Sequence, residues 1–245
     1  TSATLDHLGV LPRSLEDAAL LNDPINAYYP TDGASFPRPR PRMLEGASAE
    51  APVEPDFAWF DFPFNEMLDD DAREGMESVI DARGPRVERL PVAESLSGLI
   101  DVHITIHEYE FCRLLEEEIS ANWNLLSSTL KPIVERGRNI SEAEYEDALE
   151  VRASAQSFFE RHFNDFDAII MPSATGEAPL IRSGGTGDPV YFRIASLAGL
   201  PALTLPLLIG DNGLPVGVQL IGAVEEDDRL LRTAAWMQRI LRENS

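Results

Sequence analysis

Five short apolar segments alternate with longer stretches of helical periodicity along this chain. The first two, Phe57–Phe60 and Val87–Leu90, are separated by a predicted helix from about residue 65 to residue 82. A helix between two strands is typical of a βαβ unit, in which the strands are parallel. The third segment, DAIIMP at residues 167–172, ends at Pro172. This order of elements predicts an α/β fold.

The last two apolar segments have the pattern of a hairpin. PALTLPLLI is followed by the turn DNG at 211–213 and then by PVGVQLIG. An Asn-Gly pair between apolar arms is a strong hairpin signal, and hairpin strands are antiparallel. In the second arm the two sets of alternating residues are Val216, Val218 and Leu220, and Gly217, Gln219 and Ile221. We therefore expect a mixed sheet flanked by helices.

Capping patterns place several of the helices. Ser14 and Asp17 resemble a capping box at the start of a first helix, and Ser141 with Glu144 predicts a helix that runs to about Phe163. Helical periodicity extends from about residue 92 to 151 and beyond, and a last helix begins near Asp227 and ends in Arg239 and Arg242. The helix from Ser141 presents an apolar stripe made of Tyr145, Leu149, Ala155 and Phe159.

A proline-rich segment interrupts this pattern near the beginning of the chain. Residues 28–55 are rich in Pro, Ala, Arg and acidic residues and include PRPRPR at 37–42. Proline at this density prevents regular helices and strand pairing, so we expect an extended surface crossing. A solvated connector is the favoured interpretation over a partner-binding motif. The crossing would belong to residues 1–245 as a portion of one large domain.

The charge of the chain limits its partners. Its 245 residues include 42 Asp and Glu against 20 Lys and Arg, a formal net charge of −22. Such a chain repels phosphate backbones and anionic lipid surfaces, so we expect no nucleic-acid and no membrane partner. No apolar run approaches the roughly 20 residues of a transmembrane helix. The single cysteine, Cys112, excludes an internal disulfide and fits a reducing, cytoplasmic compartment.

Several motifs with catalytic residue types have simpler interpretations. Ser128 and Lys131 fit an S-x-x-K pattern, but its companion motifs are missing and Pro132 follows the lysine, which is the only one in the chain. Cys112 stands among apolar residues in a helical stretch, which favours core packing. Thr1 as an N-terminal nucleophile would need sandwiched antiparallel sheets, which this pattern does not predict.

Two further motifs concern metals and anions. His103 and His107 have the i, i+4 spacing that can hold zinc, but no third ligand group completes a site, and a polar helix face is favoured. His7 and His162 have no partner that the sequence identifies. The loop at 184–187, GGTG, lacks the following lysine and helix of a nucleotide loop, so we interpret it as a flexible loop that borders a pocket. We predict no metal and no cofactor.

Two blocks of the sequence together resemble the amidase-signature family. TLDHLGVLPRSLEDAALL is similar to the family stretch S-x-D-x-x-G-P-x-A-R-S-V-x-D-A-A-L. IIMPSATGEAP and TGDPVYFRIASLAGLPALTLPLLIGDNGLPVGVQLIG resemble the C-terminal region of that family. The helical middle, including EYEDAL, fits in length and position. The resemblance implies the C-terminal part of the amidase-signature fold and, for the complete protein, cleavage of carboxamide C–N bonds through a serine acyl-enzyme.

The chain departs from the family in one large respect. The family's nucleophilic serine, second serine, lysine and glycine-rich loop all lie upstream of the S-x-D block, and nothing here matches G-G-S-S-G-G. We therefore assign no catalytic residue and expect the chain to be inactive alone, with the missing N-terminal half as its partner. A homo-oligomer is compatible with the same observations. The alternative is a non-catalytic binding or regulatory domain that retains the scaffold.

The resemblance also implies where a small-molecule amide substrate would touch this chain. In the family, the loop after the strand that matches DAIIM faces the active-site cleft. We predict substrate contacts from Pro172, Ser173 and Ala174 in that loop and from Phe192 in the following segment. Packing at the end of a strand is an equally good explanation of these residues, and an aromatic with a small polar side chain would suit a mainly apolar acyl group.

Overall fold

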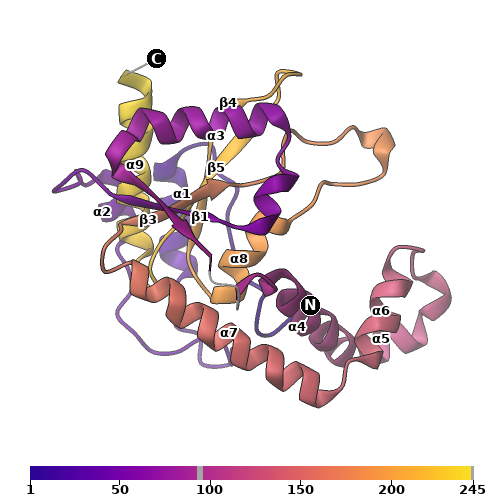
Figure 1. Ribbon diagram of the computed structural model, residues 1–245. Helices are drawn as coiled ribbons and strands as arrows, with labels where there is room; N and C mark the ends of the chain where they lie inside the picture. Colours follow the sequence, from indigo (N-terminus) through magenta and orange to yellow (C-terminus); the bar gives the residue numbers. More distant parts are fainter. Residues whose placement is uncertain (93–95, 244–245) are drawn as a thin grey trace.

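The computed structural model describes residues 1–92 and 96–243, which fold around one mixed sheet (Figure 1). The strand order is β2-β1-β3-β5-β4. β1 is parallel to β2 and β3, whereas β5 is antiparallel to β3 and β4. The predicted parallel pair, the hairpin and the mixed sheet are thereby confirmed. The strands are β1 (Phe57–Asp61), β2 (Val87–Pro91), β3 (Ala168–Pro172), β4 (Ala202–Ile209) and β5 (Pro215–Ile221).

Two helical layers cover the sheet. The helices are α1 (Leu15–Ile25), α2 (Met43–Ser48), α3 (Asp70–Arg83), α4 (Leu99–Leu114), α5 (Glu116–Ala121), α6 (Leu130–Asn139), α7 (Glu142–His162), α8 (Val190–Ala198) and α9 (Asp227–Glu243). α3 and α9 pack on one face of the sheet, and α4, α7 and α8 pack on the other (Figure 1). α1 and α2 form a further layer outside α9.

The alternation of side chains along the central strands explains why both faces need a cover. In β1, Phe57 and Trp59 point to the α3 and α9 side, and Ala58 and Phe60 point to the other side. All five residues of β3 are buried. Burial of one large apolar side chain contributes roughly 1.5–3 kcal/mol, so these two strands anchor both cores.

β4 differs from the other apolar strands because it lies at the sheet edge. Leu205 is buried, but Ala202, Thr204, Pro206 and Ile209 are exposed. One face of this strand is therefore open to solvent, although its sequence is as apolar as that of β3. The apolar run predicts a strand correctly and says nothing about its place in the sheet.

The capping patterns place the helices well. Ser141 accepts from the backbone N–H of Glu144, and the Glu144 side chain accepts from the backbone N–H of Ser141, so the predicted capping box is present. The predicted helix at 65–82 starts later than expected, at Asp70, because the turn Pro63–Met67 is a 3₁₀ helix. The helical stretch expected from residue 92 contains α4, α5, α6 and part of α7. Residues 93–95 of that prediction lie outside the described chain.

The proline-rich crossing at residues 28–55 contains a helix that the sequence analysis excludes. α2 begins directly after the last proline of PRPRPR and its arginine, and its six residues include no proline. Met43, Gly46 and Ala47 are buried against α9, and Asp23 accepts from the backbone N–H of Met43. The prediction was wrong because proline density was averaged over the segment, although a short proline-free stretch inside it has a buried side to pack.

Gly137 lets α6 approach α4 closely. A Cβ at this position would overlap the Glu108 carbonyl oxygen and the Cys112 Sγ atom. We expect Gly137→Ala to lower the free energy of unfolding by about 1–2 kcal/mol, because overpacking costs more than alanine gains in a helix. Gly9→Ala is the matched control, since no atom lies within 4 Å of a Cβ there. Urea denaturation of both variants is the measurement, and equal stability of the two would contradict this close packing.

Candidate functional site

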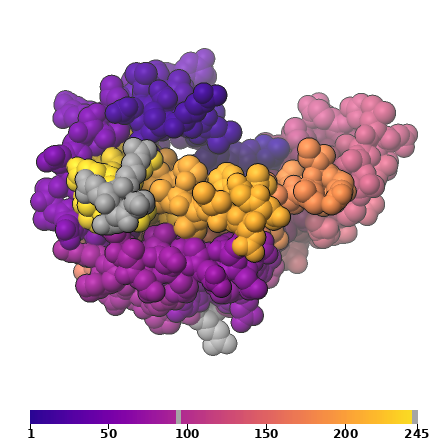
Figure 2. Space-filling view, turned by 90° about the horizontal axis from the view of Figure 1, so that it is seen from above, coloured from indigo at the N-terminus to yellow at the C-terminus, as the bar shows by residue number. Residues whose placement is uncertain are grey.

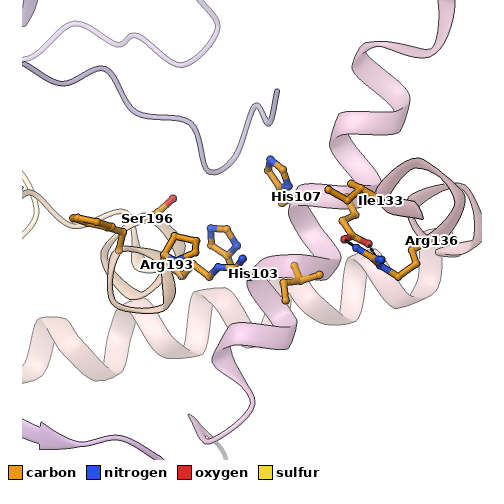
Figure 3. A pocket seen from close by; sticks show the side chains of 10 residues that line it. His103, His107, Ile133, Arg136, Arg193 and Ser196 are labelled. Atoms are coloured by element: carbon orange, nitrogen blue, oxygen red, sulfur yellow. Dashed lines mark hydrogen bonds and ion pairs between the residues drawn. The ribbon is translucent and has the colours of Figure 1, made fainter. Parts of the chain in front are cut away.

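A cleft of about 560 Å³ opens between α4, α6 and α8. This volume is in the range of small-molecule sites. Figure 3 shows the side chains that point into it from these three helices. The lining consists of His103, Ile104, His107, Glu108, Ile133, Arg136, Pro189, Phe192, Arg193 and Ser196.

Helical spacing brings the lining residues of α4 to one face. His103 and His107 are four residues apart, as are Ile104 and Glu108, so these side chains lie one turn from each other. α8 supplies Phe192, Arg193 and Ser196 from its first two turns. α6 belongs to a small lobe that projects from the body of the molecule together with α5, visible in pink in Figure 2. The cleft therefore lies where this lobe meets the main core.

One of the two arginines of the cleft is neutralised by a carboxylate. Arg136 donates from its Nε atom to both oxygens of Glu108, at 3.2 and 3.0 Å, and Arg136 Nη2 donates to the same carboxylate. Glu108 is buried, and its hydrogen bond raises the pKa of Arg136. This bidentate pair fixes α6 against α4 and satisfies the buried charge.

The two histidines form a stacked pair with their ring centroids 6.2 Å apart. Burial, assisted by the nearby charge of Arg193, lowers the pKa of His103 to about 4. Burial also lowers the pKa of His107. His103 is therefore neutral near pH 7. In the part of the chain that the structure describes, no three His, Cys, Asp or Glu side chains are grouped so that they could hold a metal ion.

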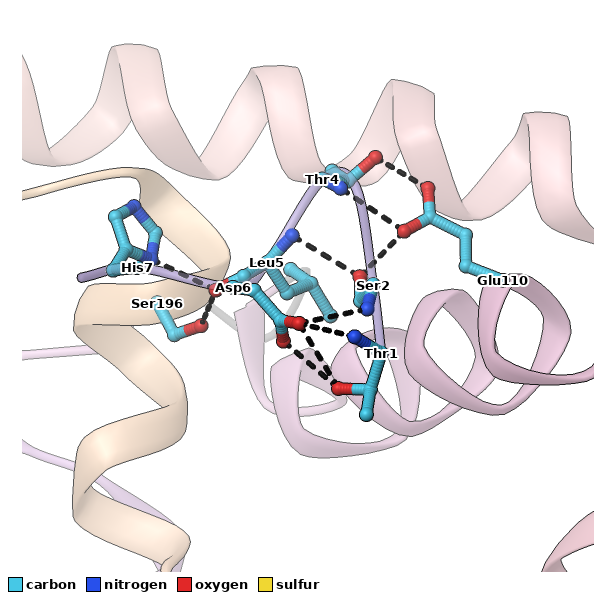
Figure 4. A network of polar contacts seen from close by, with 8 residues as sticks. All are labelled: Thr1, Ser2, Thr4, Leu5, Asp6, His7, Glu110 and Ser196. Carbon is cyan, nitrogen blue, oxygen red and sulfur yellow. Dashed lines mark hydrogen bonds and ion pairs between the residues drawn. The ribbon is translucent and has the colours of Figure 1, made fainter. Parts of the chain in front are cut away.

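A buried carboxylate next to the cleft ties the first residues of the chain to the helices (Figure 4). Glu110 accepts from the Ser2 and Thr4 hydroxyls, from the Thr4 N–H at 3.0 Å and from the Tyr145 hydroxyl at 2.7 Å. The Ser196 hydroxyl of the cleft donates to the Leu5 carbonyl at 2.7 Å. Residues 2–5 thus bridge α4, α7 and α8 and fix the helices that carry the cleft.

The predicted substrate-binding residues fall in two places. Phe192 lines the cleft and is 47% exposed. Pro172, Ser173 and Ala174 are not part of its lining. Pro172 ends β3, and the buried Ser173 donates its backbone N–H to the Gly217 carbonyl at 2.9 Å. Only one of the four predicted residues therefore belongs to this cleft.

The polar residues of the cleft could not be assigned to a common site from the sequence. His103 and His107 were a candidate metal pair with a polar helix face as the favoured interpretation, and no sequence motif singled out Arg136 or Arg193. The histidine spacing was the available signal, because it places two titratable groups on one helix face. Nothing in the sequence shows that α8 lies opposite that face.

The structure places the two motifs for which the sequence favoured simpler interpretations. Cys112 is buried, its Sγ atom lies 3.4 Å from the Val134 carbonyl oxygen, and burial raises its pKa. Ser128 lies outside α6, the helix that contains Lys131. The Lys131 Nζ atom lies 5.7 Å from the centroid of the Trp123 ring.

The fold and the cleft define an α/β protein whose mixed sheet is covered by helices on both faces, with a cleft between α4, α6 and α8 that is lined by apolar and charged side chains. The family model described as Amidase matches residues 1–231. The chain belongs to the amidase family, as the two resemblance blocks predict.

Curated relatives are about twice as long as this chain. A glutamyl-tRNA(Gln) amidotransferase subunit of a Picosynechococcus strain is 27% identical, and the match covers 97% of this chain and 58% of the relative. The same subunit from Wolbachia sp. subsp. Brugia malayi is 26% identical over 100% of this chain and 57% of its own length. The chain therefore spans a little more than half the length of these relatives.

Solved structures give the same picture of the fold. A crystal structure of an amidase matches with a TM-score of 0.75 and 25% identity, covering 97% of this chain and 54% of its own. An inhibitor-bound protein complex connected with the origin of an s-triazine catabolic enzyme reaches a TM-score of 0.83 at 22% identity, covering 96% and 54%. The predicted α/β fold, a mixed sheet flanked by helices, is thus that of amidase-signature structures.

The Glu110 contacts predict a pH-dependent contribution to stability. Burial raises the pKa of Glu110, but the hydrogen bonds from Ser2, Thr4 and Tyr145 outweigh burial and leave the pKa below its ordinary value. Because the pKa is lower in the folded state, the stabilisation is fully present above the unfolded value of about 4.3. It is lost as the pH falls through the folded pKa.

We expect Glu110→Gln to lower the free energy of unfolding at pH 7 by about 1–3 kcal/mol, because an amide cannot accept all these hydrogen bonds. The difference from the unsubstituted chain should narrow as the pH falls below the unfolded value and through the lower folded pKa of this carboxyl. Denaturation at several pH values measures both effects, with the exposed Glu146→Gln as control. A difference that does not depend on pH would contradict the ionised network.

Proposed function

We propose that this chain is the C-terminal portion of an amidase-type hydrolase that, as a complete protein, cleaves carboxamide C–N bonds through a serine acyl-enzyme. The serine oxygen attacks the amide carbon, the C–N bond breaks, and the nitrogen leaves with a proton as ammonia or an amine. Water then attacks the acyl ester and releases the carboxylic acid and the free serine. In the family that this chain resembles, a lysine relays these protons through a second serine.

The family match, the partial length and the order of the motifs together support this proposal. The family model matches nearly the whole chain, whereas the chain spans little more than half of its relatives. The order of the S-x-D block and the G-L-P-V-G-V-Q arm corresponds to the later part of the family pattern. Since no Ser/Lys pair occurs in the described residues in a catalytic arrangement, the nucleophile would belong to the other half, and this chain would be inactive alone.

The role of this chain would be to form the far wall of the acyl pocket. Phe192 is accessible in the cleft and could contact an apolar acyl group there. Pro172, Ser173 and Ala174, which lie outside the lining of this cleft, would contact the substrate from the end of β3. The reaction would require no cofactor, because serine acylation needs neither a metal nor a nucleotide.

An uncovered apolar surface supports a missing N-terminal half as the partner. Eight exposed large apolar side chains fall within residues 8–36, namely Leu8, Leu11, Leu20, Leu21, Ile25, Tyr28, Tyr29 and Phe36. The edge strand β4 also has no strand partner among the described residues on the side away from β5. A second segment of the same domain that packs there would cover both features.

The relatives suggest one variant of this function. They are amidotransferase subunits, and a protein that releases ammonia for tRNA-linked amidation would use the same acyl-enzyme chemistry. The net charge of −22 argues against direct tRNA contact by this chain. The single cysteine supports a reducing, cytoplasmic setting. Within residues 1–92 and 96–243, every helix is too short or too polar to cross a membrane.

A non-catalytic binding or regulatory domain is the second candidate. The observation in its favour is that α3, α9, α4, α7 and α8 cover β1 and β3 on both faces without any further segment. A core of this kind supports folding without the other half. The reading frame upstream of Thr1 separates the two candidates, since an amidase requires a lysine followed by a glycine- and serine-rich loop there.

The proposal predicts that the purified 245-residue chain does not hydrolyse simple aryl or aliphatic amides. Both nucleophile and base would be missing, and removal of these groups abolishes acyl transfer. Activity should appear when the upstream segment is supplied, in one chain or as a separate fragment. Turnover by the chain alone, with stoichiometric labelling of one of its serines by a fluorophosphonate, would contradict the proposal.

Lys131 should be dispensable in the complete enzyme, because its Nζ atom lies over the Trp123 ring and Ser128 lies outside the helix that contains the lysine. We expect Lys131→Met to leave kcat within about threefold, a barrier change of roughly 0.7 kcal/mol. Substitution of the upstream lysine is the matched comparison and should reduce kcat by several orders of magnitude. A loss of that size in Lys131→Met would instead support Ser128 and Lys131 as a catalytic pair.

A further inference from the structure

Arg193 is the cation of the cleft that has no carboxylate partner in the described residues. Arg136, the other arginine in the lining, is held by Glu108, whereas no ion pair of the described residues includes Arg193. The Arg193 Nε atom is buried and has no hydrogen-bond partner in the described chain. Burial of such a donor without an acceptor is unfavourable, and an acceptor group of a ligand in the cleft would relieve this cost.

A second unpaired polar atom lies in the same cleft. The His103 Nδ1 atom is buried and also has no partner among the described residues. Figure 3 shows Arg193 on α8 extending toward His103 on α4. Both unpaired atoms therefore belong to neighbouring side chains on opposite walls of one cleft, and Ile104 and Phe192 belong to the same lining.

The charge balance of the cleft indicates the sign of the missing group. Glu108 is the only acidic side chain in the lining formed by the described residues, and its charge is balanced by Arg136. Arg193 thus leaves a net positive cleft in a chain whose net charge is −22. A guanidinium presents a planar fork of donors that matches a carboxylate in two parallel hydrogen bonds.

We propose that this cleft is a subsite for a carboxylate on the substrate, with Arg193 as its charged contact and His103 as a neighbouring polar contact. The inference rests on the proposed function, because it narrows the substrate to amides that carry a carboxylate at a distance from the amide group. The apolar side chains of Ile104 and Phe192 would contact the carbon chain between the two groups.

The test compares two small ligands of the same shape. Succinamate carries a carboxamide and a carboxylate, and succinamide replaces that carboxylate by a second, neutral carboxamide. We expect the 245-residue chain to bind succinamate about tenfold or more tightly than succinamide, the range of a charged hydrogen bond. Titration calorimetry gives the affinities, and ligand-induced shifts of the His103 and His107 ring resonances locate the binding.

Variants identify the contact. Arg193→Met should remove the preference for succinamate, and Arg193→Lys should retain part of it, since lysine keeps the charge without the fork. Arg152→Met is the matched control, because the Arg152 Nε atom is also buried without a partner in the described residues but Arg152 does not line the cleft. If Arg193→Met does not fold, the histidine shifts in the unsubstituted chain and the lysine variant still decide the question.

Several results would overturn the inference. These are equal affinity for the two ligands, absence of succinamate binding, an unchanged preference in Arg193→Met, or inorganic phosphate binding as tightly as succinamate. Because binding is measured without turnover, it is independent of the hydrolysis test above. A complete enzyme that hydrolyses neutral amides as well as succinamate would refute the subsite alone, whereas an inactive complete protein would refute the proposed function.

Discussion

The double-sided burial of β1 and β3 is the constraint on which the rest of the molecule depends. Each strand carries large apolar side chains on both faces, so each needs a helical layer on both sides. α9 returns from the end of the chain to cover one face, while α4 and α7 cover the other. The cleft exists because α4 and α8 must pack on the same face and because α6 then approaches α4 from outside. Gly137 and the Glu108–Arg136 ion pair keep α6 close to α4.

Elements with a local cause could be predicted from the sequence. The strands at Phe57, Val87 and Ala168, the hairpin and the capping box at Ser141 all depend on neighbouring residues in the chain. The position of an element in the sheet could not be predicted in the same way. β3 and β4 are equally apolar, yet one is central and the other is an edge strand, because strand order depends on contacts between distant segments. The α2 helix was missed because its burial depends on α9, which lies near the other end of the chain.

The candidate site shows the same division between local and distant causes. The i, i+4 spacing of His103 and His107 indicates a shared helix face and was visible in the sequence. The sequence left two interpretations, a metal pair and the favoured polar helix face, because it does not show what lies opposite. In the structure an arginine of α8 lies there, and a cation next to two imidazoles opposes the binding of a metal ion. Phe192, which the family resemblance suggested as a substrate contact, lies in the same lining, whereas Pro172, Ser173 and Ala174 do not.

The buried charged and polar groups in and next to the cleft differ in whether they are paired. Most of the acidic side chains lie at the surface, where water screens them, whereas Glu108 and Glu110 are buried and each accepts several hydrogen bonds. Both buried carboxylates of α4 thus have hydrogen-bond donors within the chain. Arg193 and His103, in the same part of the molecule, differ from them, since their buried nitrogens have no acceptor in the described residues. Unpaired buried atoms also occur outside the cleft, as in Arg152, but among the described residues Arg193 and His103 are the ones that line it, so a ligand in the cleft is placed to complete them.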